Sequence, residues 1–340
     1  MKVGICGIGF MGMIHYLAYQ QVEGVQVKAI CEKIPERLQG DWRKIKGNFG
    51  PEGKIMDLTG IATYDSLEKM LENPELDVID ICLPPSQHAD AVVAVFESGK
   101  HCFCEKPISL ISADAERMVA ASKKAGKMLC IGHVLPFFGE YNFARTVALS
   151  GKYGKLLGGH FNRVISDPVW LTNFYSMETA GGPMLDLHIH DAHFIRLMFG
   201  MPKMVQCTGR LRGDIPEYFN TQFLFDDPAL VVTATSGTIQ QQGRPFTHGY
   251  EIHFEKATIL FDSFMGKPVT ILTEDGKIEE ARIDGLGDIG AFVQEVKEMA
   301  KAMQSETPSL LLDGQLARDA LLICSKETES LRLRAPVQVS

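Results

Sequence analysis

The sequence lacks three features that would place it in other classes of protein. No apolar run approaches the ~20 residues needed to cross a bilayer, and the first residues alternate like a strand rather than forming a signal sequence. No run of Lys and Arg would follow a phosphate backbone, and 34 basic against 42 acidic residues give a formal net charge of −8. Internal repeats and low-complexity segments are also missing. We therefore expect a cytoplasmic globular protein whose partners include neither nucleic acid nor a membrane.

Metal-binding cysteine patterns are also missing, although the chain has eight cysteines. Cys102 and Cys104 form a Cys-x-Cys pair, but no second pair follows at ligand spacing. Apolar, strand-like runs hold or border Cys6, Cys31, Cys82, Cys102, Cys104 and Cys130. Because small thiols are common in such buried settings, we predict reduced cysteines and no bound metal.

The length of 340 residues and the apolar content of 45% suit two domains. In residues 1–133, short apolar runs alternate with amphipathic helical stretches, which predicts a Rossmann domain with a doubly wound parallel sheet. The expected strands are 3–6, 25–31, 78–83, 101–104 and 128–132. Residues 134–340 predict an α+β domain with a large, mostly antiparallel open sheet and a helix near 184–199.

A glycine-rich loop ends the first expected strand and opens the first helix. It reads Gly7-Ile-Gly9-Phe10-Met11-Gly12, a setting in which backbone amides and a helix N-terminus hold a pyrophosphate. Glu32 ends the second strand 20 residues after Gly12, where a carboxylate would accept hydrogen bonds from the adenosine ribose. This carboxylate would repel a 2′-phosphate, so we predict NAD as the cofactor. NADP stays possible because Lys33 and Arg37 could offset the charge, and a glycine turn that binds nothing is the less favoured alternative.

Two segments carry a resemblance to a known family. DVIDICLPPSQHADAVVAVFESGKHCFCEKP, residues 77–107, and GGPMLDLHIHD, residues 181–191, resemble the Gfo/Idh/MocA family of oxidoreductases. The resemblance implies an NAD(P)-dependent oxidoreductase that transfers hydride between the nicotinamide and a secondary alcohol or carbonyl carbon. Its substrate would be a sugar, inositol or related cyclic polyol. Redox-assisted glycoside cleavage and a non-catalytic dinucleotide sensor are the two alternatives.

The family resemblance also assigns three catalytic residues. Lys106 would hydrogen-bond the reacting oxygen, while Asp186 and His190 would orient the substrate and move the proton. The residues themselves agree with these roles, because Pro107 keeps Lys106 on extended chain near the end of a strand. Asp186 and His190 are four residues apart and share one face of the expected helix.

Further residues are expected around the cofactor and the substrate. The cofactor set is completed by Leu83, Pro84, Pro85, His88, Glu105 and Lys106. The substrate set adds His133, Arg163, Trp170, Tyr175 and His193. Arg163 would supply a cation that relatives often carry near His133, and residues 166–180 either cover a sugar face or form a packed surface loop. His193 either contacts substrate or packs, and helix geometry disfavours a metal cluster that includes His188.

Association of identical chains is the last expectation. Apolar strands of the second domain, including 229–235, need a cover that the few following helices would not provide. We therefore predict a homodimer or homotetramer built on this sheet.

Overall fold

The computed structural model describes residues 1–283, 285 and 287–339, which fall into two compact units. The first unit comprises Met1–Phe137 and the described part of Leu286–Arg318, and the second comprises Phe138–Gly285 and the described part of Asp319–Ser340. The sequence-based division differs from this arrangement in two respects, and one is that it ends the first domain at residue 133 rather than at Phe137. It assigns the whole of 134–340 to the second domain, whereas helix α8 (Gly290–Ser305) packs against helix α1 (Phe10–Tyr19) in the first unit.

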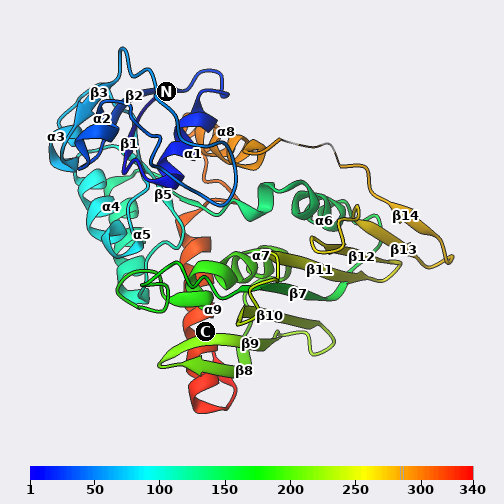
Figure 1. Ribbon diagram of the computed structural model, residues 1–340. Helices are drawn as coiled ribbons and strands as arrows, with labels where there is room; N and C mark the ends of the chain where they lie inside the picture. The colour runs from blue at the N-terminus through cyan, green and yellow to red at the C-terminus, as the bar shows by residue number, and fades with distance from the viewer. Residues whose placement is uncertain (284, 286, 340) are drawn as a thin grey trace. The chain divides into compact units, whose positions relative to one another are not determined.

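A six-stranded parallel sheet forms the centre of the first unit, in the order β3-β2-β1-β4-β5-β6. Figure 1 labels its strands β1, β2, β3 and β5. Its strands are β1 (Lys2–Cys6), β2 (Gln26–Cys31), β3 (Ala62–Tyr64), β4 (Val78–Ile81), β5 (His101–Glu105) and β6 (Leu129–Gly132). The helices besides α1 and α8 are α2 (Pro35–Leu38), α3 (Leu67–Leu71), α4 (His88–Glu97) and α5 (Ser112–Ala125). The strand order reverses between β1 and β4, and such a reversal opens a crevice outside the carboxyl ends of the strands. This sheet confirms the predicted Rossmann fold.

The second unit is built on a nine-stranded sheet in the order β14-β13-β12-β11-β7-β10-β9-β8-β15. Its long strands are β7 (Leu156–Ser166), β8 (Met204–Arg212), β9 (Ile215–Leu224), β10 (Val231–Ile239) and β11 (Thr247–Phe254). The shorter ones are β12 (Ala257–Asp262), β13 (Thr270–Thr273), β14 (Ile278–Glu280) and β15 (Val337–Gln338). Among the described strands of this sheet, only the β7/β10 pair is parallel, so the predicted large, mostly antiparallel sheet is confirmed.

Helices of the second unit are α6 (Gly139–Ser150), α7 (Ile189–Phe199) and most of α9 (Gly314–Leu333). Helix α7 packs against β7, and the turn before it, Met184–His188, packs against β9 and β10. That turn is a π-helix, whereas the sequence predicts one regular helix over 184–199. Two consecutive glycines, Gly181 (φ +71°) and Gly182 (φ +65°), lead the chain into the turn in a left-handed conformation that other residues adopt with strain.

Candidate functional site

The glycine loop has the geometry that a dinucleotide pyrophosphate requires. Gly7 adopts a φ of +94°, and a Cβ there would lie 2.6 Å from the carbonyl oxygen of Cys82. A Cβ on Gly12 would lie 2.0 Å from the carbonyl oxygen of Gly7, so only glycine lets α1 approach the turn. Gly9 has no atom within 4 Å of its Cβ position, so its backbone is open on that side. Partly exposed Phe10 and Met11 follow at the start of α1.

Glu32 is fixed beside this loop by backbone and side-chain donors. The amide of Ile8 donates to its Oε2 at 2.9 Å, and the amides of Lys33 and Ile34 donate to its Oε1 at 2.7 and 3.1 Å. Arg37 donates from Nη1 to Oε2 at 3.2 Å, and the Glu32 side chain is 10% exposed. Arg37 is thus paired with the carboxylate that we expect to bind the ribose. A carboxylate held at the end of β2 next to the loop suits NAD.

The chain after β4 carries four residues that we predicted to surround the cofactor. Leu83 and Pro85 are partly exposed and Pro84 is exposed, so each can present atoms to a ligand. His88 differs, because it is 0% exposed. Its Nδ1 lies 2.9 Å from the Pro107 carbonyl oxygen and its Nε2 lies 2.8 Å from the Leu83 carbonyl oxygen. His88 therefore ties the two loops together, and its direct contact with the cofactor stays a prediction.

Glu105 and Lys106 end strand β5 at the carboxyl edge of the sheet. Glu105 is 6% exposed, and its Oε2 accepts a hydrogen bond from the backbone amide of Lys106 at 3.1 Å. Lys106 is partly exposed. The carboxyl ends of parallel strands meet at one edge of a sheet, so Lys106 lies on the same edge as the glycine loop after β1.

Behind that edge lies a buried contact that the sequence reasoning missed. His15 of α1 donates from Nδ1 to Oδ2 of Asp80 at 2.9 Å, and its Nε2 lies 2.8 Å from Oε1 of Glu105. The signal was an acidic residue inside the otherwise apolar strand Val78-Ile-Asp80-Ile. The thiol of Cys82 also approaches, and its potential ligand atom lies within 4.8 Å of those of His15 and Asp80. Because histidine and carboxylate already touch at hydrogen-bond distance, the geometry is that of proton sharing rather than of a metal site.

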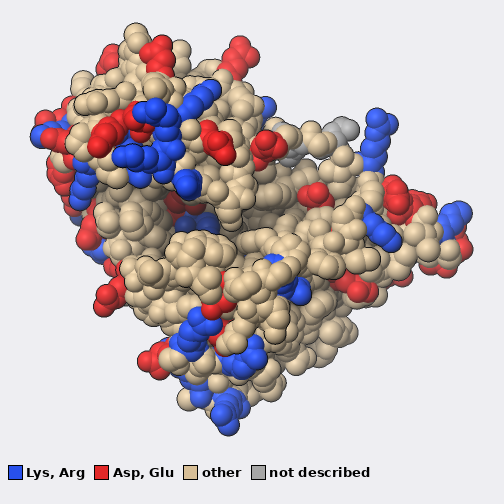
Figure 2. Space-filling view, viewed as in Figure 1, with Lys and Arg blue, Asp and Glu red and all other residues tan. Residues whose placement is uncertain are grey.

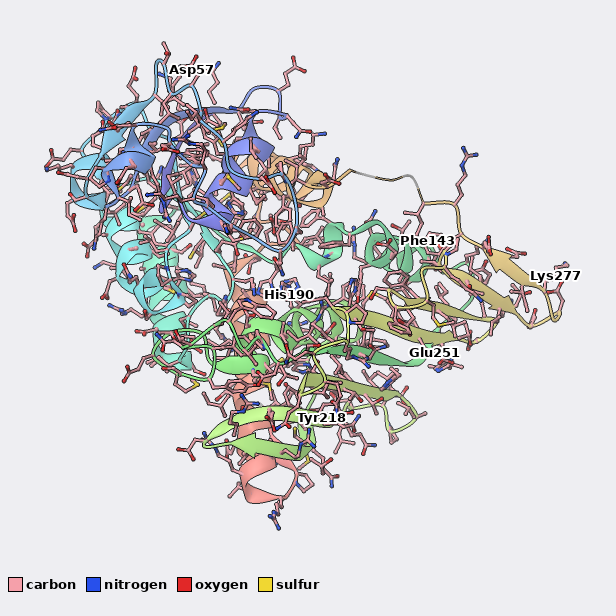
Figure 3. All side chains as sticks on the ribbon, in the orientation of Figure 1. Asp57, Phe143, His190, Tyr218, Glu251 and Lys277 are labelled. Carbon is pink, nitrogen blue, oxygen red and sulfur yellow. The ribbon has the colours of Figure 1, made fainter. Side chains whose placement is uncertain are left out.

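Asp186 and His190 lie at the start of the helical segment of the second unit. Figure 3 labels His190 there. Asp186 belongs to the π turn and His190 to the first turn of α7, and both are partly exposed. A π turn widens the helix, and such turns occur frequently at functional sites. Asp186 and His190 are four residues apart, so they still point to similar sides of this helical segment. The neighbouring His188 turns away and is buried, with its Nε2 2.9 Å from Oε1 of Glu327 and its Nδ1 3.0 Å from the Ser236 hydroxyl.

The side chain of Arg163 is buried in an ion pair with Asp191. Its Nε and Nη2 donate to the two oxygens of Asp191 at 2.7 and 3.0 Å, and its side chain is 4% exposed. Arg163 thus forms a buried ion pair that holds β7 to α7, and its contact with substrate stays a prediction. His133 and His193 are both 0% exposed, which favours a packing role for His193 over substrate contact.

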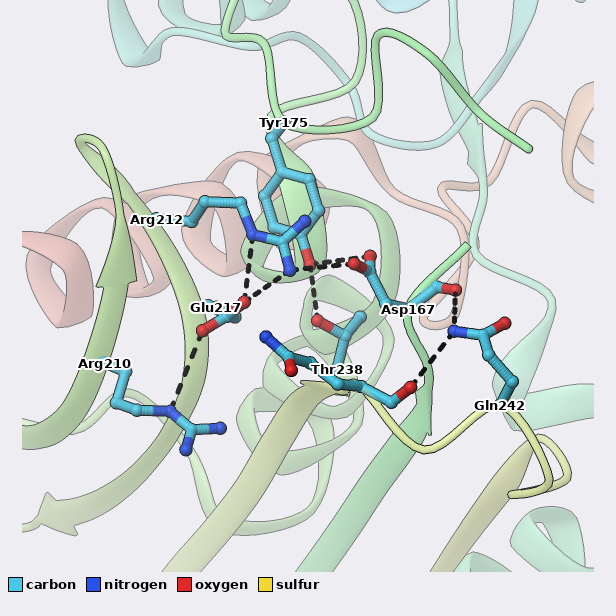
Figure 4. A network of polar contacts seen from close by, with 8 residues as sticks. Asp167, Tyr175, Arg210, Arg212, Glu217, Thr238 and Gln242 are labelled. Carbon is cyan, nitrogen blue, oxygen red and sulfur yellow. Dashed lines mark hydrogen bonds and ion pairs between the residues drawn. The ribbon is translucent and has the colours of Figure 1, made fainter. Parts of the chain in front are cut away.

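The segment 166–180 is anchored by a polar network around Tyr175 (Figure 4). The Tyr175 hydroxyl donates to Oδ1 of Asp167 at 3.2 Å and lies 2.5 Å from the Thr238 hydroxyl. The guanidinium of Arg212 lies 3.9 Å from the centre of the Tyr175 ring and donates to Asp167 at 2.8 Å. Burial raises the pKa of Tyr175 to about 12, so this hydroxyl stays protonated. Trp170, by contrast, is 69% exposed, so its ring can face a ligand.

Positive and negative side chains are interspersed over the face drawn in Figure 2. This mixture matches the absence of basic runs in the sequence. Among the described helices, none combines the length and apolar character needed to span a bilayer.

Comparisons with known proteins agree on one family. The model of an oxidoreductase family with an NAD-binding Rossmann fold, Gfo/Idh/MocA, matches residues 1–133, and the model of its C-terminal domain matches residues 141–260. Myo-inositol 2-dehydrogenase of Thermotoga maritima is 26% identical over 356 aligned residues, which span 100% of this chain and 98% of that protein.

Solved structures share the whole fold. A probable dehydrogenase from Thermotoga maritima superposes with a TM-score of 0.81 at 22% identity, and covers 100% of this chain and 99% of its own. Levoglucosan dehydrogenase, solved with NADH and levoglucosan, superposes with a TM-score of 0.86 at 20% identity and the same coverage. The glycine loop, the Glu105-Lys106-Pro107 turn and both family models thus point the same way, and the chain belongs to the Gfo/Idh/MocA family of NAD-binding oxidoreductases.

Proposed function

We propose that this protein is an NAD-dependent dehydrogenase that moves hydride between the nicotinamide and a secondary alcohol carbon of a sugar, inositol or related polyol. The observation that carries the proposal is the position of Lys106. It follows β5 at the carboxyl edge of the same parallel sheet whose glycine loop follows β1. Relatives named for inositol and levoglucosan supply the substrate class.

Three side chains would handle the proton in this proposal. NAD, when bound, supplies the hydride acceptor. An alcohol gives up hydride readily only when its proton is drawn away, and His190 would take that proton as a general base. Lys106 would donate a hydrogen bond to the oxygen as negative charge grows on it. Asp186, on the same side of the helical segment, would hold the His190 ring in the orientation that accepts the proton.

The preference for NAD would come from Glu32. Its carboxylate already accepts three backbone amides and Arg37, so it is ordered before any ligand arrives. Such a group would accept the ribose hydroxyls and repel a 2′-phosphate. Arg37 partly neutralises the same carboxylate, so NADP would bind more weakly rather than be excluded.

The direct test is turnover on a panel of polyols. Purified protein is mixed with NAD and, separately, with myo-inositol and levoglucosan, and NADH formation is followed by its absorbance. Oxidation of either compound, with the ketone identified by mass spectrometry, supports the proposal. Release of a free aglycone from a glycoside without net NADH would instead support redox-assisted glycoside cleavage. Tight NADH binding without turnover on a broader polyol panel would support a dinucleotide sensor.

Association and location complete the proposal. We infer a homodimer or homotetramer built on the nine-stranded sheet, because Val231 of β10 and Leu157 of β7 are 60% and 47% exposed on the single chain. Light scattering at micromolar concentration tests this, and a monomeric mass contradicts it. We also infer a cytoplasmic location, where the eight unpaired cysteines would stay reduced.

A further inference from the structure

Four ionisable side chains are buried together behind the carboxyl edge of the parallel sheet. They are His15 of α1, Asp80 of β4, Glu105 of β5 and Glu295 of α8, and they form what we call the His15 cluster. Glu105 is 6% exposed and the other three are 0% exposed. Burying so many ionisable groups is unfavourable unless they pair, so their arrangement calls for a specific role.

His15 joins the two neighbouring strands β4 and β5. One ring nitrogen donates to Asp80 at 2.9 Å, and the other lies 2.8 Å from Glu105, so each nitrogen faces a carboxylate. The ring also stacks on Phe103, with centroids 5.3 Å apart and an interplanar angle of 12°. A ring that is hydrogen-bonded to Asp80, within ion-pair distance of Glu105 and stacked on Phe103 is confined to one orientation.

The Glu105 carboxylate also contacts the backbone of Lys106. Its Oε1 faces His15, and its Oε2 accepts the backbone amide of Lys106 at 3.1 Å. Gly132 of β6 leaves the necessary space, because a Cβ there would lie 3.1 Å from Oε1. The Glu105 carboxylate therefore connects the His15 ring of α1 with the backbone of Lys106.

We propose that His15 is a positioning residue that holds the Glu105 carboxylate against the Lys106 amide and so fixes the backbone from which the lysine reaches the reacting oxygen. This inference deepens the proposed function and rests on it for its kinetic consequence. The contacts from His15 to Glu105 and from Glu105 to the Lys106 amide are seen in the structure and do not depend on the proposed function.

The charges around His15 favour the doubly protonated ring that this link needs. Burial opposes a charged imidazole, but contacts with Cys82 and with the Asp80 carboxylate raise the pKa of His15 well above its ordinary value. Glu295 faces the same group, and burial followed by repulsion from Glu105 raises its pKa well above the ordinary value. Tyr19 donates its hydroxyl to Asp80 at 2.9 Å. The two nitrogens of the His15 ring thus face the carboxyl groups of Asp80 and Glu105.

The test compares His15→Gln with a matched control, Tyr19→Phe. Both substitutions remove a buried hydrogen bond to Asp80, but only His15→Gln breaks the contact with Glu105. We expect His15→Gln to speed hydrogen exchange at the Lys106 amide and to lower kcat about 10-fold to 10²-fold, with NADH affinity close to that of the parent. Tyr19→Phe should leave exchange at Lys106 and kcat near the parental values. Nitrogen NMR of the His15 ring in the parent should show both nitrogens protonated at pH 8.

Two results would overturn the inference. Equal changes in both variants would mean that His15 only supports stability, and a neutral His15 ring with unchanged exchange at Lys106 would remove the link. Exchange and ring NMR need no substrate. If no polyol is oxidised by the parent, the proposed function fails while these two measurements still decide the role of His15.

Discussion

The carboxylate of Asp191 holds the guanidinium of Arg163 through two hydrogen bonds, 2.7 Å from Nε and 3.0 Å from Nη2, with side chains only 1% and 4% exposed. This pair joins the central strand β7 to helix α7, one residue after His190. The base proposed to take the alcohol proton is therefore next to a rigid, buried anchor.

Breaking this pair from one side should destabilise the fold strongly. Asp191→Ala leaves Arg163 buried and charged without its partner, which we expect to lower the free energy of unfolding by about 3–5 kcal/mol. Urea denaturation measures the change. The double variant Arg163→Met with Asp191→Leu should recover much of the loss, because no charge then remains buried. A small stability loss in Arg163→Met combined with a large rise in KM would instead show that Arg163 binds substrate.

Replacing Glu32 should relax the choice of cofactor. In Glu32→Ser, the carboxylate that would repel a 2′-phosphate is gone, while Arg37 loses its partner and becomes available to a phosphate. We expect the ratio of kcat/KM for NAD to that for NADP to fall by about tenfold or more, since one lost charge contact is worth roughly 1–3 kcal/mol. A parent protein that already prefers NADP by a wide margin would contradict this role for Glu32.

Glu295 should make stability depend on pH. Burial, then Glu105, raises the pKa of its carboxyl well above 4.5, so the folded protein keeps a proton that the unfolded chain releases above that pH. A raised pKa stabilises the fold below the unfolded value and loses that contribution as pH rises. Relative to Glu295→Gln, the parent should therefore lose about 1.4 kcal/mol per pH unit above pH 4.5, until the folded pKa is passed. Urea titrations from pH 4 to 9 would show a constant difference if Glu295 were ionised in the fold.

Removing the proposed proton-handling residues should lower turnover more than cofactor binding. His190→Ala loses the general base, which we expect to reduce kcat about 10²-fold to 10⁴-fold. Lys106→Met loses a hydrogen bond that strengthens in the transition state, and Asp186→Asn weakens the orientation of His190. NADH fluorescence should report near-parental affinity in all three variants. Near-parental turnover in Lys106→Met or His190→Ala would contradict the catalytic role proposed for that residue.

The sequence by itself determined five of the six strands of the Rossmann sheet and its glycine loop, while the short, largely exposed β3 was not predicted. Both depend on short-range signals, namely apolar runs of strand length alternating with helices and glycines at Gly7 and Gly12. The turn needs a left-handed residue and a close approach of helix to loop, so the local residues predict it. The two motif segments likewise indicate the family, because their residues are contiguous.

Only the tertiary structure decided which ionisable side chains meet. His15 and Asp80 are 65 residues apart, and His188 and Glu327 are 139 apart, so no local pattern connects them. Burial forces such groups to find partners, but the fold selects the partner. The same reason accounts for Arg163, which the family resemblance suggests as a cation for substrate and which packing pairs with Asp191. Helix α8 joins the first unit because its apolar face packs on α1, a long-range contact that chain order does not indicate.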